Sequence, residues 1–176
     1  MTINTNRIFN TLLKELNIDY NTVDITLNDK IETLLRGDII ESNDCVTLST
    51  LSAKTVCDES TVDKIGVQDF SNHFHIDSSL ISEDSNDIHK IVSYGLTTLK
   101  RLVKRFKDEK RLGIFYSISI ETIELSKKLN IDLGWDDDEP DYIGCRISFY
   151  KNPTGETVTD KDLENYKYNA MMTIQT

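Results

Sequence analysis

The chain has 176 residues, with 20 Lys and Arg against 30 Asp and Glu, so its formal net charge is −10. This length suits one domain and is too short for a complete (β/α)₈ barrel. Its 38% hydrophobic and 28% charged residues are typical of a globular protein and argue against a collagen, a coiled coil or a disordered chain. We expect a single domain over residues 1–176, with a weak sub-boundary near residues 78–85 as an option.

The N-terminal part of the chain changes from a helical to an alternating pattern. Apolar residues spaced by three and four positions predict a helix over about residues 5–17, with Thr5 or Asn4 as its cap. In residues 22–27, Val, Ile and Leu alternate with polar residues, which predicts a half-buried strand.

The next segment begins with a helix and then loses a clear period. Asn28 is suited to cap a short helix that ends at Gly37. Residues 45–48 and 54–57 are predicted to be short strands, separated by Ser, Asp and Asn. Whether residues 39–74 form a sheet of their own is left open.

A long amphipathic helix is predicted over about residues 85–108, with Ser85 as its cap. Acidic residues lie at its start and basic residues at its end, which complements the helix dipole. A helix of this kind normally forms one wall of the core. Its apolar stripe comprises Ile88, Ile91, Val92, Leu96, Leu99, Leu102, Val103 and Phe106.

Two strands with clean alternation follow, at residues 112–120 and 142–150. A short helix over 122–129 lies between them, a turn at 152–155 and a short helix within 160–168 come after, and we expect the tail to be loosely held. Strands with one apolar and one polar face favour an antiparallel sheet. The fold class is therefore predicted as α+β, with a mainly antiparallel sheet packed against the long helix and the N-terminal helix.

The three cysteines, Cys45, Cys57 and Cys145, are widely spaced and odd in number. They suggest neither a disulfide framework nor a zinc site, so we expect small buried thiols and a cytoplasmic location. No apolar run approaches 18 residues, and the start lacks a basic region followed by an apolar one. We therefore expect no membrane span and no secretory signal.

The densest cluster of charge adjoins the only tryptophan. It comprises Trp135, Asp136, Asp137, Asp138, Glu139 and Asp141. A solvated loop is one interpretation, and a partner-binding surface is another, because Trp is enriched at interface hot spots and acidic arrays attract cationic partners. A calcium loop is the third, but Asp141 occupies the position that requires Gly.

A basic strip closes the long helix and has a net charge of +5 over residues 100–111. It includes Lys100, Arg101, Lys104 and Arg105, which we name as a secondary binding site. These cations can simply stabilise the helix end or pair with the chain's own acids. Binding of an acidic partner surface, self-association and nucleic-acid binding are the other options, although direct nucleic-acid binding is not expected without further basic or aromatic patches.

His73 and His75 would point the same way in a strand, as a pair of metal ligands does. The sequence has no second such pair, no GxSxG, no HExxH and no phosphate-binding glycine loop. We therefore expect no catalytic residues, no bound metal and no cofactor.

The favoured hypothesis is a non-enzymatic acidic protein that inhibits a basic partner, such as a nuclease or another nucleic-acid-binding effector. Immunity proteins that neutralise nuclease toxins, and phage inhibitors of bacterial defence systems, have this profile by analogy. The physical reason is that a cleft built for phosphates also attracts an array of carboxylates. The alternatives are a metal-dependent hydrolase that uses acids with His73 or His75, and a structural subunit of a larger assembly.

Overall fold

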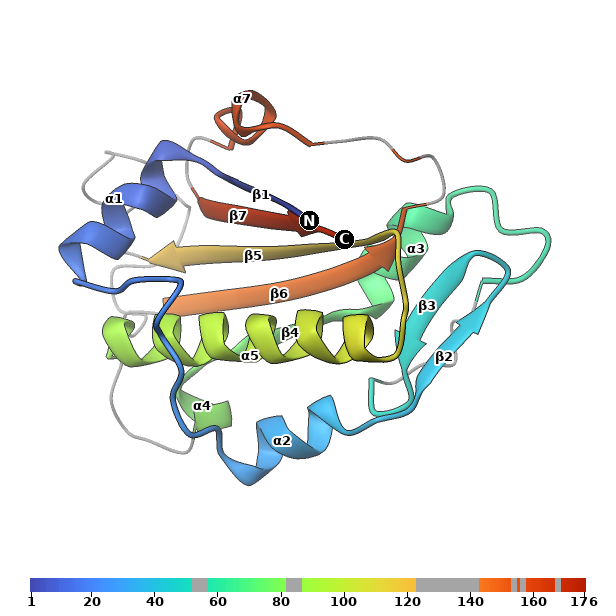
Figure 1. Cartoon of the computed structure of the whole chain (residues 1–176), viewed down its shortest axis with the longest axis horizontal. Helices are drawn as coiled ribbons and strands as arrows, with labels where there is room; N and C mark the ends of the chain where they lie inside the picture. The colour runs from blue at the N-terminus through green and yellow to red at the C-terminus, as the bar shows by residue number, and fades with distance from the viewer. Residues whose placement is uncertain (52–56, 82–86, 123–142, 153–154, 156–157, 167–168) are drawn as a thin grey trace, which may run out of the picture.

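The computed structural model describes residues 1–51, 57–81, 87–122, 143–152, 155, 158–166 and 169–176. It is an α+β fold in which a five-stranded antiparallel sheet is packed against helices (Figure 1), as predicted. The strands are β1 (Thr2–Thr5), β2 (Ile39–Ser42), β3 (Cys45–Leu48), β4 (His73–Ile76), β5 (Ile114–Thr122), β6 (Ile143–Lys151) and β7 (Ala170–Gln175). The helices are α1 (Arg7–Glu15), α2 (Asp29–Leu35), α3 (Lys64–Ser71), α4 (Ser78–Ile81), α5 (Ile88–Asp108) and α7 (Asp160–Leu163).

The main sheet has the strand order β1-β7-β5-β6-β4. The two predicted long strands, β5 and β6, pair with each other over nine residues, from Ile114 opposite Lys151 to Thr122 opposite Ile143. The expectation of a loose tail was wrong, because β7 lies between β1 and β5 and brings the two termini together (Figure 1). Residues 170–174 are all buried, so burial on both faces of the sheet holds this end of the chain in place.

Helix α5 covers one face of the sheet, and its predicted apolar stripe forms the centre of the core. Leu96, Leu99 and Phe106 are fully buried, as are Ile118 and Ile147 of the sheet. The cap is Asp87 rather than the predicted Ser85, because the Asp87 carboxylate accepts a hydrogen bond from Lys90 N at 3.3 Å. An acidic cap suits the positive end of the helix dipole.

Helix α1 begins later than predicted, and its cap is Asn6 rather than Thr5 or Asn4. Residues 2–5 are taken up by β1, a strand that the sequence pattern did not reveal. The fully buried Asn6 side chain accepts hydrogen bonds from Phe9 N (2.9 Å) and Met171 N (3.0 Å) and donates to the carbonyls of Tyr166 (3.3 Å) and Asn169 (2.7 Å). One amide therefore caps a helix and joins both ends of the chain.

The predicted strand at residues 22–27 is wrong, since this segment is irregular. Its apolar side chains still pack on the core: Leu27 is buried, and Val23 and Ile25 are partly buried. Alternation here reflects a chain lying along the core without a partner strand. Helix α2 follows as predicted, capped by Asn28, whose side chain accepts from Ile31 N at 3.0 Å.

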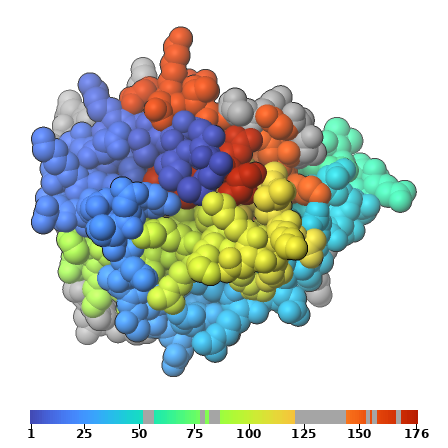
Figure 2. Space-filling view, in the orientation of Figure 1, coloured from blue at the N-terminus to red at the C-terminus, as the bar shows by residue number. Residues whose placement is uncertain are grey.

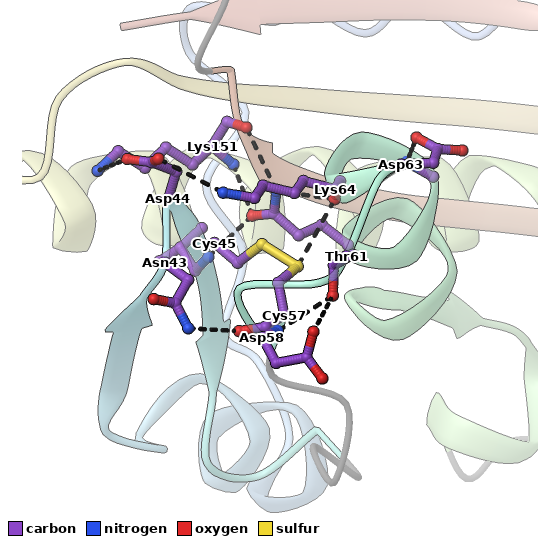
Figure 3. Close-up of a disulfide and its surroundings, with 12 residues drawn as sticks. Asn43, Asp44, Cys45, Cys57, Asp58, Thr61, Asp63, Lys64 and Lys151 are labelled. Atoms are coloured by element: carbon purple, nitrogen blue, oxygen red, sulfur yellow. Dashed lines mark hydrogen bonds and ion pairs between the residues drawn. A yellow bond between two sulfur atoms is a disulfide. The ribbon is translucent and has the colours of Figure 1, made fainter.

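Strands β2 and β3 form a separate two-stranded sheet, while β4 joins the main sheet. The expectation of free thiols was wrong for Cys45 and Cys57, which form a disulfide with Cα atoms 5.9 Å apart (Figure 3). Cys145 is a buried free thiol, as expected. The side-chain oxygen Oε1 of Gln68 accepts hydrogen bonds from Val46 N (2.8 Å) and Lys151 N (3.0 Å), and thereby joins β3 to β6.

Several predicted features lie wholly or mostly outside the described residues: the strand at 54–57, the helix at 122–129 and the turn at 152–155. The helix predicted within 160–168 is α7, which is shorter and is capped by Thr159. Within the described part of the chain, none of the helices combines the length and the apolar character that crossing a bilayer requires.

Candidate functional site

The predicted partner-binding residues lie outside the described part of the chain, so this prediction is untested. They are Trp135, Asp136, Asp137, Asp138, Glu139 and Asp141. The sequence places them between β5 and β6, in a segment of residues 123–142 that contains seven acidic and two basic side chains.

A second acidic segment, which we call the acidic loop, lies within the described residues at 58–63. It follows the disulfide and leads into α3, and it projects from the end of the molecule near the β2–β3 sheet (Figure 1). The Asp58 carboxylate accepts hydrogen bonds from Ser60 N (2.9 Å), Ser60 Oγ (2.7 Å) and Thr61 Oγ1 (3.1 Å). These bonds, chiefly the one from the Ser60 side chain, lower the pKa of Asp58, so it is ionised at neutral pH.

The acidic loop also exposes an apolar side chain. Val62 is 99% exposed, directly before Asp63, whose carboxylate caps α3 by accepting from Gly66 N at 2.8 Å. The Cys45–Cys57 bond and a hydrogen bond from Asn43 Nδ2 to the Cys57 carbonyl (3.0 Å) attach the start of the loop to the hairpin (Figure 3). The loop therefore presents carboxylates and one apolar residue from an anchored base.

The predicted basic strip lies along α5, where its first cation holds the irregular segment that precedes α2. Lys100 Nζ donates to the carbonyls of Tyr20 (3.2 Å), Asn21 (3.1 Å) and Val23 (2.8 Å). It also lies 5.6 Å from the centre of the Tyr20 ring. The three donors of this ammonium are thus used within the chain, and among the described residues its charge is not paired with a carboxylate.

Arg101, Lys104 and Arg105, three further cations of the strip, form ion pairs. Arg101 contacts Glu32 through a short hydrogen bond and lies 3.6 Å from the Asp24 carboxylate. Lys104 pairs with Asp108, and Arg105 donates to Glu109 at 3.1 Å and to the Leu35 carbonyl. Lys100, Arg101 and Arg105 therefore attach α5 to neighbouring segments, while the pairs with Asp108 and Glu109 lie within the end of the helix. Both uses favour the structural interpretation.

A groove of about 500 Å³ runs beside this strip. It lies on the face shown in Figure 2, where the blue N-terminal residues border the yellow-green surface of α5. Its lining is mixed in character: Met1, Tyr20, Asp24, Thr97, Lys100, Arg101, Val103, Lys104, Lys107 and Asp108. The sequence pattern revealed the basic stripe but not the groove, because residues 20–24 reach α5 only through the tertiary fold.

His73 and His75 do share one face of a strand, as predicted, with ring centres 5.4 Å apart. In the adjacent strand Arg146 Nη2 donates to Asp69 of α3 at 2.7 Å, and the fully buried Ser148 donates to the same carboxylate at 2.6 Å. Asp69 thus joins α3 to β6 through these two hydrogen bonds. Among the described residues, no group of three His, Cys, Asp or Glu side chains is arranged to hold a metal ion.

Comparison with known proteins gives one match. A family model described as the Uncharacterized protein PM0498 family matches residues 4–176. The chain belongs to this family. No curated protein matches the chain, and no solved structure matches it either. The description of the PM0498 family names neither a reaction nor a partner, so the function must be argued from the chain's own geometry and charge.

Proposed function

We propose that this member of the PM0498 family is a non-enzymatic acidic interaction protein that binds and blocks a basic partner, such as a nuclease or another nucleic-acid-binding effector. The observation that supports this proposal is that cations of the basic strip are bound by groups of the chain itself. Lys100, Arg101, Lys104 and Arg105 of the basic strip are engaged by carbonyls and carboxylates of the chain itself, while the formal charge of −10 leaves a large excess of acids. A field of that sign favours encounter with a cationic surface.

Two acidic segments are suited to the contact. The segment containing Trp135 carries the larger excess of acids, and the acidic loop adds the exposed Val62 on a base that the hydrogen bond from Asn43 to the Cys57 carbonyl attaches to the hairpin. An apolar anchor within a rim of charge is the usual composition of an interface hot spot. In this proposal the carboxylates occupy the phosphate-binding cleft of the partner and inhibit it by covering that cleft.

Affinity capture tests the proposal. The tagged chain is used as bait in an extract of its native cell at low ionic strength and again in about 1 M sodium chloride, where the Debye length falls to about 3 Å. We expect a basic protein to be captured at low salt only, and the purified chain to inhibit its nucleic-acid-processing activity stoichiometrically.

Matched charge variants identify the surface. Asp136→Asn/Asp138→Asn removes two charges beside Trp135, and Asp29→Asn/Asp38→Asn removes two acids elsewhere on the surface. Capture should be weakened by the first pair and retained by the second. Equal capture by both variants, or the absence of a cationic partner at low salt, would contradict the proposal.

A cytoplasmic location is part of the proposal and has a consequence for the disulfide. Disulfides rarely persist in the cytosol, so Cys45 and Cys57 would be reduced in the cell. Alkylation of the denatured protein straight from cells, without reductant, distinguishes the two states. Modification of all three cysteines supports a cytoplasmic location, and modification of Cys145 alone contradicts it.

A further inference from the structure

The lining of the groove beside α5 contains four basic and two acidic side chains among the described residues. Its two carboxylates, Asp24 and Asp108, lie next to Arg101 and Lys104 and offset them. Lys100 is held by neutral carbonyls, and Lys107 Nζ donates to the neutral sulfur of Met1 at 3.0 Å. Within the described part of the chain, neither lysine is paired with a carboxylate, although the formal charge of the protein is −10.

The groove is laid out along one stripe of α5. Thr97, Lys100, Lys104 and Lys107 follow one another at intervals of three and four residues, which places them on one side of the helix. Ten residues at 1.5 Å each give this stripe a length of about 15 Å. A surface of that length accommodates a small molecule with a charged end and an extended body.

The groove walls add apolar contact. Tyr20 lines the groove, and burial raises the pKa of its hydroxyl so that it stays neutral. Val103 and Met1 also line the groove, and the volume of about 500 Å³ falls within the range of small-molecule sites. An apolar body beside Tyr20 and a charged end near the lysines would use both parts of the lining.

We propose that this groove binds a small organic anion, in which a carboxylate, sulfonate or phosphate is attached to an apolar or aromatic body. Lys104 and Lys107, both exposed, contact the anionic group. Lys100, fixed by three carbonyls, adds positive potential without having to reorganise. This site is separate from the partner-binding surfaces proposed above, because it selects the opposite charge.

The test uses anilinonaphthalene sulfonate, an aromatic anion that fluoresces on binding, and phenylnaphthylamine, its uncharged parent. Fluorescence titration of the intact chain should show saturable binding of the sulfonate and affinity at least about tenfold weaker for the uncharged compound, as expected for a contact to a charged group. High salt should weaken binding of the sulfonate and leave binding of the uncharged compound unchanged. Equal affinity for the two compounds would overturn the proposal.

Two double variants locate the site. Lys104→Gln/Lys107→Gln removes the two exposed groove cations, and the control Lys14→Gln/Lys161→Gln removes two exposed cations from α1 and α7. Sulfonate binding should weaken about tenfold or more in the first variant and stay unchanged in the second. Equal weakening in both would show only the effect of net charge and would refute the groove as the site. Thermal unfolding verifies that both variants remain folded.

Discussion

The structural interpretation of the basic strip makes a sharp prediction for Lys100. In Lys100→Met the aliphatic stem is kept, while the ammonium that bonds the carbonyls of Tyr20, Asn21 and Val23 is lost. Hydrogen bonds to charged groups contribute about 1.5–3 kcal/mol each when well buried. Because these carbonyls are only partly buried and can bind water in the variant, we expect a total loss of about 2–3 kcal/mol in unfolding free energy.

Urea denaturation measures this loss. For a slope of about 2 kcal/mol per molar urea, the midpoint should fall by about 1–1.5 M. The control is Lys104→Met, which removes a cation from the same helix whose side chain is 75% exposed and pairs with Asp108. A pair of this kind contributes only about 0.3–0.5 kcal/mol. Similar midpoints for the two variants would refute the view that Lys100 holds residues 20–23 on α5.

Three further predictions test the packing and the electrostatics. Asn6→Ala should lower the unfolding free energy by about 3–5 kcal/mol, measured by urea denaturation, because four main-chain groups lose a buried partner. Gly95→Ala should destabilise by about 1 kcal/mol despite its better helix propensity, because the new Cβ would lie 2.5 Å from Cys145 Sγ; adding Cys145→Ala should restore the melting temperature. The hydrogen bond from Lys151 lowers the pKa of Glu41 below its ordinary 4.5, so its stabilisation is present above that pH and lost below it; melting temperatures should fall less steeply between about pH 5 and pH 3 in Glu41→Gln.

Elements with a sustained period could be predicted from the sequence. Five turns of apolar spacing identified α5, and clean alternation identified β5 and β6, because each element buries one regular face against the core. The cap of α2 was also predictable, since Asn28 and the residue that it caps are only three positions apart. Local patterns were thus sufficient wherever the stabilising contacts lie within one element.

Elements that depend on distant partners could not be predicted in this way. Strand β7 is buried on both faces over residues 170–174, and the successive Met171 and Met172 interrupt the apolar alternation that marks β5 and β6. Residues 22–27 alternate, yet no strand of the described chain pairs with them, and the Val23 carbonyl accepts a hydrogen bond from Lys100 instead. The pairing of Cys45 with Cys57 likewise depends on the tertiary fold, which their spacing of twelve residues does not reveal.

The two proposals respond to charge in opposite directions, and this makes them separable. Lys104→Gln/Lys107→Gln makes a chain of formal charge −10 more negative by two units, so it should weaken binding of an organic anion while keeping or strengthening capture of a basic partner. Asp136→Asn/Asp138→Asn should do the reverse. If both pairs of substitutions moved both activities together, neither surface would be acting through its local charge, and the excess of acids would serve solubility alone.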